Sequence, residues 1–284
     1  MKGFEQYRNL DDDGLHTPEV GAWAEKKYQL LYTYSHMFAR SMKQKWQRVY
    51  VDLFSASGRS RIRGTDRIVL ASPLLALEVP DKFDRYIFCE QDESLIGALK
   101  LRVARNYPNV DVRFIEGDVN QLINEVINDL PPINRDNKIL GFCFVDPCGM
   151  KNIQFKTIRR LATRFMDFLI LIPTDMDAIR NVALYTSNSN PTVDNFVDTS
   201  EWRKEWSKAQ SQNVGFDIFI ARYFSEQMKI LDYRFGGLDE SVLIRSSEKN
   251  LRLYRLGFYS RHPLGGKFWE EAKKSSMDQR SLFD

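Results

Sequence analysis

The sequence contains few residues of the kinds that build disulfide scaffolds or metal sites. Only three of its 284 residues are cysteines, and two of these, Cys89 and Cys143, lie in apolar runs typical of strands. The three histidines are far apart along the chain. We therefore expect reduced cysteines and predict no metal centre.

Long hydrophobic runs and a strong charge of one sign are also missing. No apolar stretch approaches the ~18 residues needed to span a bilayer, and the N-terminus lacks the order of a secretion signal. We therefore expect a cytoplasmic protein without membrane contact. The net charge is only +3, so the chain does not resemble proteins that coat nucleic acid. With 43% apolar residues it can fold as one large domain, or as one domain with an insertion.

The pattern along the chain divides it into four parts. Residues 1–17 are polar and include Asp11-Asp12-Asp13-Gly14, which predicts a flexible or loosely docked lead-in. Residues 18–46 predict covering helices, with Thr17 as the N-cap, Pro18 in the first turn and apolar residues at helical spacing. Residues 47–174 and 231–284 form the main domain, and residues 175–230 a helical insertion.

Strands and helices alternate through the main domain, which predicts an α/β fold with a doubly wound, mostly parallel sheet. An antiparallel C-terminal hairpin follows, at 242–244 and 253–259. The strands are expected at residues 49–54, 85–89, 112–115, 139–145 and 168–172. The helices are expected at residues 74–79, 93–106, 119–130 and 155–165, the first capped by Ser72. In the insertion we expect helices around 178–185, 202–210 and 216–228, with a loop at 186–199.

Acidic residues stand at or just after the ends of successive expected strands. They are Asp52, Glu90, Asp118 and Asp146. Open α/β sheets bind ligands at this edge, and small residues up to Gly58 allow the backbone to approach a ligand closely. The order predicts an S-adenosylmethionine pocket, in which Glu90 accepts from the ribose and Asp118 from the adenine amino group. The predicted cofactor-binding residues are Asp52, Phe54, Ser55, Ala56, Gly58, Glu90, Gln91, Asp118, Val119 and Asp146.

Two other interpretations of these acids were weighed. A nicotinamide cofactor is the weaker alternative, because the Gly-x-Gly-x-x-Gly spacing is absent. Each acid taken alone can also be a solvated strand end or a helix cap.

The segment Asp146-Pro147-Cys148-Gly149 carries the predicted catalytic residues Asp146, Pro147 and Cys148. A carboxylate and a free carbonyl at the pocket mouth can hold a planar amine for methylation, which requires positioning more than a strong base. Cys148 offers a rival hypothesis, a thiolate that adds to a pyrimidine. An inert cysteine is the third interpretation.

Basic and aromatic residues in two segments predict contacts with a nucleic-acid substrate. The predicted contacts are Arg59, Arg61, Arg63, Arg67, Trp202 and Lys204. The alternatives are a solvated basic face and, for Trp202 with Trp206, an anchor that packs the insertion onto the main domain.

The motifs at residues 50–58, 72–77, 144–149 and 262–269 resemble those of the three-Cys-motif partner protein family, bacterial proteins similar to class I S-adenosylmethionine-dependent methyltransferases. The resemblance implies a Rossmann-like methyltransferase domain, with Asp52, Ser55 and Gly58 lining the cofactor and Glu90 and Asp118 beside it. It also places Asp146 and Pro147 toward the substrate. Relatives often carry an aromatic residue where Cys148 stands.

The resemblance further implies a partner with a three-cysteine motif that looks like a radical S-adenosylmethionine protein. Together these features predict a methyltransferase acting on a nucleobase amino group in DNA or RNA, and the association points to nucleic-acid modification or phage defence. The alternative is a cofactor-binding or inactive interaction subunit of that partner. Methylation of a protein or small molecule stays open, because a fold does not name a substrate.

Overall fold

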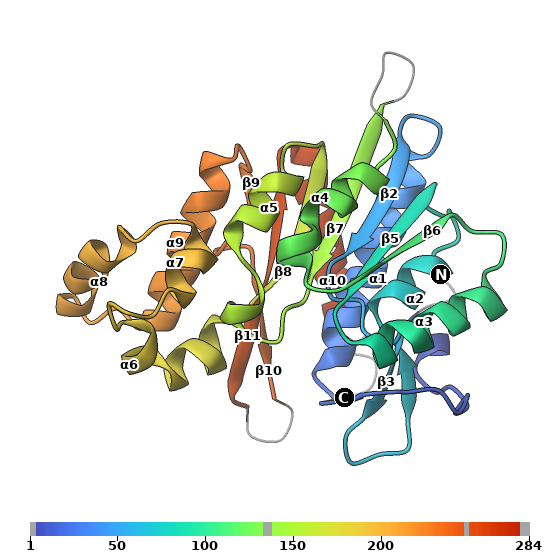
Figure 1. Cartoon of the computed structure of the whole chain (residues 1–284), viewed down its shortest axis with the longest axis horizontal. Helices are drawn as coiled ribbons and strands as arrows, with labels where there is room; N and C mark the ends of the chain where they lie inside the picture. The colour runs from blue at the N-terminus through green and yellow to red at the C-terminus, as the bar shows by residue number, and fades with distance from the viewer. Residues whose placement is uncertain (1–3, 133–137, 247–249, 279–284) are drawn as a thin grey trace.

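The computed structural model describes residues 4–132, 138–246 and 250–278 (Figure 1). In this part of the chain, eight strands form one sheet in the order β10-β11-β8-β7-β2-β5-β6, with β9 paired to β11. The strands are β2 (Gln47–Asp52), β5 (Arg85–Glu90), β6 (Val112–Glu116), β7 (Ile139–Val145), β8 (Met166–Ile172), β9 (Phe235–Gly236), β10 (Val242–Arg245) and β11 (Arg252–Ser260). Strands β6, β5, β2, β7 and β8 are parallel, whereas β11 runs antiparallel to β8 and β10. The predicted fold class, an α/β fold with a mostly parallel, doubly wound sheet and a closing antiparallel hairpin, is confirmed.

The central strand β7 shows why the sequence forms this sheet. Its residues are almost all apolar and buried, as expected for a strand with helices on both faces. Successive side chains enter different cores: Phe142 and Phe144 pack on one face of the sheet, and Cys143 and Val145 on the other.

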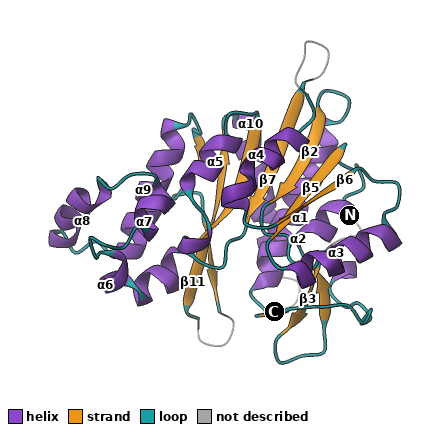
Figure 2. Ribbon diagram, viewed as in Figure 1, coloured by secondary structure: helices purple, strands orange, loops and turns teal. Residues whose placement is uncertain are grey.

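Helices cover both faces (Figure 2). The face with Phe144 is covered by α1 (Ala24–Met42), α2 (Ser72–Glu78), α3 (Glu93–Asn106) and α10 (Pro263–Asp278). The opposite face is covered by α4 (Val119–Asp129), α5 (Phe155–Leu161), α7 (Thr192–Val197) and α9 (Phe216–Ile230). None of the helices in the described ranges is long and apolar enough to cross a membrane. Helix α10 was not expected from the sequence, although its Trp269 is buried in the core.

The segment after β2 differs from the expected loop. It contains β3 (Arg59–Ile62) and β4 (Ile68–Leu70), which form a small sheet with β1 (Glu19–Val20) from before α1. In β3, Ser60 and Ile62 are buried and the arginines that alternate with them are partly exposed. The expected helix start at Thr17-Pro18 is therefore wrong, because the chain first pairs with β3 and a single helix, α1, starts at Ala24. The expected Ser72 cap is also wrong, because Ala71 precedes the first residue of α2.

The insertion is helical throughout much of its length. It holds η3 (Thr174–Ala178), α6 (Val182–Tyr185), α7, α8 (Trp202–Ser211) and α9, and α8 lies at its outer end (Figure 1). Helix α7 lies in the stretch predicted as a loop. The residues Asn190-Pro191 just before its first residue are typical of a loop, which is why the helix was not predicted. Val193, Phe196 and Val197 are nevertheless spaced as one helical face and are buried.

Candidate functional site

Three of the predicted acids lie on one edge and one face of the sheet. Asp52 ends β2 and stands in register with Phe88 of β5 and Phe144 of β7. Glu90 ends β5 two residues beyond Phe88, so its side chain shares the face of Asp52. Asp146 directly follows β7 and bonds to Lys27 of α1, the helix that covers this same face. Chain order reverses between β2 and β7, with β5 and β6 on one side and β8 on the other. Such a switch point, at the carboxyl ends of the strands, is where open α/β sheets bind ligands.

Asp52 is fully buried, and among the described residues the groups that hydrogen-bond to it are all uncharged. The Tyr50 hydroxyl donates to its Oδ2 at 3.3 Å, the Phe54 amide donates to its Oδ1 at 3.2 Å, and the Ser72 hydroxyl also bonds to it. The pKa of Asp52 is raised to about 7, mainly by burial and also by the charge of Asp146, while the three hydrogen bonds act to lower it. A positively charged ligand would stabilise the ionised form, so the site fits a cation.

The loop after β2 makes a tight turn that is tied to β5. The Ser55 amide and hydroxyl both donate to the Cys89 carbonyl, at 2.9 and 3.0 Å. Ala56 has φ of +48°, an uncommon value for a residue with a side chain, and its amide donates to Glu90 at 2.8 Å. Gly58 has φ of +82°, and a Cβ there would lie 2.7 Å from Leu74 Cγ. The turn therefore requires glycine at position 58.

Glu90 and Asp118 play different local roles. Glu90 Oε2 accepts from Ala56, and Oε1 accepts from the amides of Gln91 and Asp92, so the carboxylate holds the turn against the start of α3. Since a carboxylate offers about four acceptor positions, it retains capacity for a ligand hydroxyl. Asp118 is the N-cap of α4 and accepts from the Asn120 amide at 2.9 Å, which is the role of a helix cap.

Phe54, Gln91 and Val119, also predicted for the cofactor pocket, each follow one of these acids within two residues of the chain. Phe54 is half-buried and Gln91 is exposed, whereas the side chain of Val119 belongs to the core under α4.

Asp146 has a partner that the sequence did not predict. Lys27 of α1 donates to Asp146 Oδ2 at 2.5 Å, and only 7% of Lys27 is exposed. Burial would lower the pKa of Lys27, but the charge of Asp146 and the nearby hydroxyls of Tyr254 and Tyr28 raise it, so the lysine stays charged. One sequence signal could have revealed it: Lys27 lies between Ala24 and Leu31 on the apolar stripe of the helix.

The rest of the predicted catalytic segment lies beside Asp146. Pro147 is buried and Cys148 is exposed. Partial burial of the thiol raises the pKa of Cys148, and the charges of Asp146 and Glu90 raise it further. An activated cysteine nucleophile requires the opposite environment.

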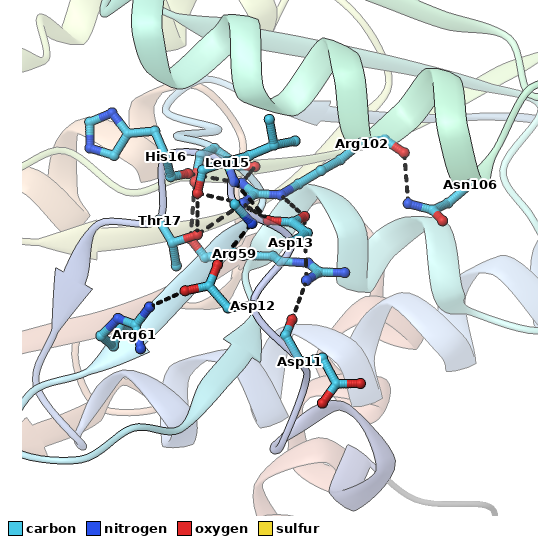
Figure 3. A network of polar contacts seen from close by, with 12 residues as sticks. Asp11, Asp12, Asp13, Leu15, His16, Thr17, Arg59, Arg61, Arg102 and Asn106 are labelled. Atoms are coloured by element: carbon cyan, nitrogen blue, oxygen red, sulfur yellow. Dashed lines mark hydrogen bonds and ion pairs between the residues drawn. The ribbon is translucent and has the colours of Figure 1, made fainter.

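The four arginines predicted to bind nucleic acid are each paired with a carboxylate. The pairs are Arg59 with Asp13 at 3.3 Å, Arg61 with Asp12 at 2.6 Å, Arg63 with Glu19 at 3.7 Å and Arg67 with Glu25 at 2.8 Å. All these acids come from the first 25 residues, and Figure 3 shows Asp11, Asp12 and Asp13 beside Arg59 and Arg61. The expected basic surface is therefore largely neutralised within the chain, which corrects the prediction made from its charge pattern.

Arg102 of α3 fixes the N-terminal segment in place (Figure 3). It is fully buried and makes two 2.8 Å bonds to Asp13. It also donates to the carbonyls of Leu15 and His16 and to the hydroxyl of Thr17, and at 2.7 Å to the carbonyl of Ser57. Residues 13–17 are thus docked beside the turn that ends at Gly58, in contrast to the loosely attached lead-in that the sequence predicts.

Trp202 and Lys204 lie in the insertion, away from the acids. Trp202 is fully buried, donates from Nε1 to Asp194 at 2.7 Å and packs against Phe216. Both contacts lie within residues 175–230, so Trp202 belongs to the core of the insertion itself, and its predicted contact with a substrate base is wrong. Lys204 is exposed on α8 and pairs with Glu201 at 2.6 Å.

A cavity of about 540 Å³ lies elsewhere, between the start of α1 and β10. Charged residues line it, among them Arg8, Glu25 and Arg245. Its lining includes none of the residues predicted for the cofactor or the catalytic step.

The structure was compared with solved structures, and the sequence with protein families and curated proteins. No protein-family model matches the sequence, and no curated protein matches it significantly. A solved protein of Legionella pneumophila is 14% identical, with 88% of this chain and 92% of that chain covered and a TM-score of 0.49. The O-methyltransferase of Bacillus cereus in complex with SAH is 12% identical, covering 87% and 84%, with a TM-score of 0.48. A putative O-methyltransferase of Klebsiella pneumoniae is 13% identical, covering 87% and 84%, with a TM-score of 0.45. At this distance the similarity concerns the fold and names no substrate.

Proposed function

We propose that the chain is an S-adenosylmethionine-dependent methyltransferase that modifies an amino group of a nucleobase in DNA or RNA. One observation carries this proposal: Asp52, Glu90 and Asp146 share one face and one edge of the sheet at its switch point. Solvated strand ends would leave Asp52 exposed, whereas it is buried with a raised pKa.

The residues around the turn fit the cofactor. When bound, S-adenosylmethionine supplies a methyl group attached to a positively charged sulfur. The sulfur is the leaving group and keeps the electron pair of the broken bond. Asp52 would offer its charge to the cationic methionine end, and Glu90 would accept from the ribose hydroxyls. Ser55, Ala56 and Gly58 would allow the backbone to approach closely, beside Phe54 and Gln91. Asp118 would meet the adenine from the start of α4.

Asp146 and Pro147 would act on the substrate. The Asp146 carboxylate would accept a hydrogen bond from the target amine, orient its nitrogen and take the proton that the nitrogen loses on methylation. Asp146 is the only member of the acid group with a lysine against it, among the contacts described here. Position rather than basicity would supply most of the rate enhancement.

A second candidate is the interaction subunit implied by the three-Cys-motif partner resemblance. Two observations favour it. Lys27 already bonds to one oxygen of Asp146, and the arginines of the predicted basic surface form ion pairs with carboxylates of the same chain. On this reading the fold holds the cofactor or no ligand, and presents a substrate to the radical S-adenosylmethionine-like partner.

Calorimetry with S-adenosylmethionine tests the first candidate. We expect binding to the wild-type protein and to Asp146→Asn, and a Kd raised about tenfold or more in Asp52→Asn, which cannot ionise. Glu226→Ala removes an exposed acid of α9 and should bind like the wild type. Absence of binding heat in the wild-type protein would refute the proposal.

Transfer of a labelled methyl group to a mixed-sequence oligonucleotide separates the two candidates. The methyltransferase hypothesis requires that Asp146→Asn binds the cofactor but loses transfer. Full activity of the complex with the partner after Asp146→Asn would favour the interaction subunit.

A further inference from the structure

The environment of Asp146 restricts what can bind there. Lys27 comes from α1, far from Asp146 in the sequence, and its ammonium lies 5.0 Å from the ring centre of Tyr28 and 6.0 Å from that of Tyr254. Buried lysines are rare unless paired, so this contact is a built feature of the site. It leaves the carboxylate partly accessible, since 17% of the Asp146 side chain is exposed.

Tyr254 of β11 adds an unusual group to the same place. It is only 9% exposed, and its hydroxyl has no hydrogen-bond partner among the described residues. The hydroxyl of Tyr28 differs, because it bonds to Ser60 at 3.2 Å. Leaving a buried hydroxyl without a hydrogen bond destabilises the protein, so such a group calls for an explanation. One explanation is a ligand that forms a hydrogen bond with this hydroxyl.

We propose that Lys27, Asp146 and Tyr254 form the acceptor subsite, and that Lys27 restricts it to uncharged aromatic amines. This inference rests on the proposed function and names the substrate class for that site. Lys27 is a positioning residue that holds Asp146 through Oδ2, and the Tyr254 hydroxyl pairs with a polar atom of the substrate.

The restriction follows from charge. An alkylamine such as a lysine side chain is protonated at neutral pH and would bring a second cation beside the Lys27 ammonium, where like charges repel strongly at low dielectric. The amino group of adenine or cytosine is uncharged. It can donate to the remaining acceptor positions of the carboxylate without displacing Lys27.

The test for Tyr254 compares two tyrosine variants of the full chain. Tyr254→Phe should lower kcat/KM for a mixed-sequence oligonucleotide about tenfold, with unchanged cofactor affinity and no loss in melting temperature, because its hydroxyl has no protein partner. The control Tyr28→Phe should lower the melting temperature, because it breaks the bond to Ser60. A Tyr254→Phe protein with unchanged kcat/KM, or with a melting temperature as low as that of Tyr28→Phe, would overturn this assignment.

The test for Lys27 compares two acceptors, the oligonucleotide and a polylysine peptide. The wild type should favour the oligonucleotide by at least about tenfold in kcat/KM, and Lys27→Met should reduce this ratio while binding the cofactor normally. Lys43→Met removes the lysine of an exposed ion pair with Asp81 at the end of the same helix, and should leave the ratio unchanged. If Lys27→Met does not fold, the double variant Lys27→Met/Asp146→Asn removes both charges of the pair and should retain the fold without transfer.

The outcomes separate the two proposals. Cofactor binding combined with equal methylation of polylysine would refute the role of Lys27 and leave a methyltransferase. No cofactor binding in the wild type would refute the methyltransferase function, and the acceptor subsite with it.

Discussion

Replacing Asp52 with asparagine should change how the stability of the protein depends on pH. Burial raises the pKa of this carboxyl from an ordinary value of 3.8 to about 7. Between these two values the folded state binds more protons than the unfolded state, so the free energy of unfolding falls as pH rises. The loss is about 1.4 kcal/mol per pH unit and reaches about 4 kcal/mol above pH 7. About 2–3 kcal/mol of it falls between pH 5 and pH 8. Asparagine does not titrate and escapes this cost.

Denaturant unfolding of wild type and Asp52→Asn at pH 5 and pH 8 measures the effect. The variant should gain about 2–3 kcal/mol relative to the wild type between the two pH values, whatever its absolute stability. Asp118→Asn is the matched control, because asparagine also caps helices and Asp118 lies at the start of α4. Its stability should follow that of the wild type across this range. Parallel curves for Asp52→Asn and the wild type would refute the assignment of a buried, protonated Asp52 and remove the physical reason for a cation site.

Three further substitutions test other parts of the description. Gly58→Ala should destabilise the protein more than Gly64→Ala by about 1–3 kcal/mol in denaturant unfolding, because both have positive φ but only Gly58 is crowded, by Leu74; equal losses would contradict the tight turn. Arg102→Met should cost roughly 3–5 kcal/mol and speed proteolysis of residues 10–17, whereas Arg113→Met, at an exposed arginine, should do neither; a protease-resistant N-terminus would show that Arg102 does not hold it. Cys148→Ser should retain methyl transfer, measured with labelled cofactor, and a complete loss would restore the thiolate hypothesis.

The main sheet could be predicted because its signals are local. Strand β7 and helix α3 have the bounds that the sequence predicts, since an apolar run and a helical stripe each carry their own period. The small sheet could not be predicted in this way. Its strand β1 has two residues, and it forms only because β3, about forty residues later, pairs with it.

The same distinction between local and long-range signals separates the residues of the candidate site that could be predicted from those that could not. Asp52, Glu90 and Asp146 follow strand ends, so the parallel sheet brings them to one edge. Lys27 and Tyr254 come from α1 and β11, and although the apolar stripe of α1 indicates that Lys27 faces the core, no local pattern indicates that either residue meets Asp146. The arginines after β2 were misjudged for the same reason. Asp12 and Asp13, which pair with two of them, lie in the segment predicted as loosely docked, and Glu19 and Glu25 lie in the predicted covering helices.

The docked N-terminal segment bears on how shortened versions of this protein would behave. A chain starting at Pro18 would lack Asp12 and Asp13, so the guanidinium groups of Arg59, Arg61 and Arg102 would lose their carboxylate partners. Such a fragment would present a cationic face that the longer chain conceals, and would adsorb to polyanions by charge alone. Affinity for DNA or RNA measured on it would describe the truncation rather than the natural surface.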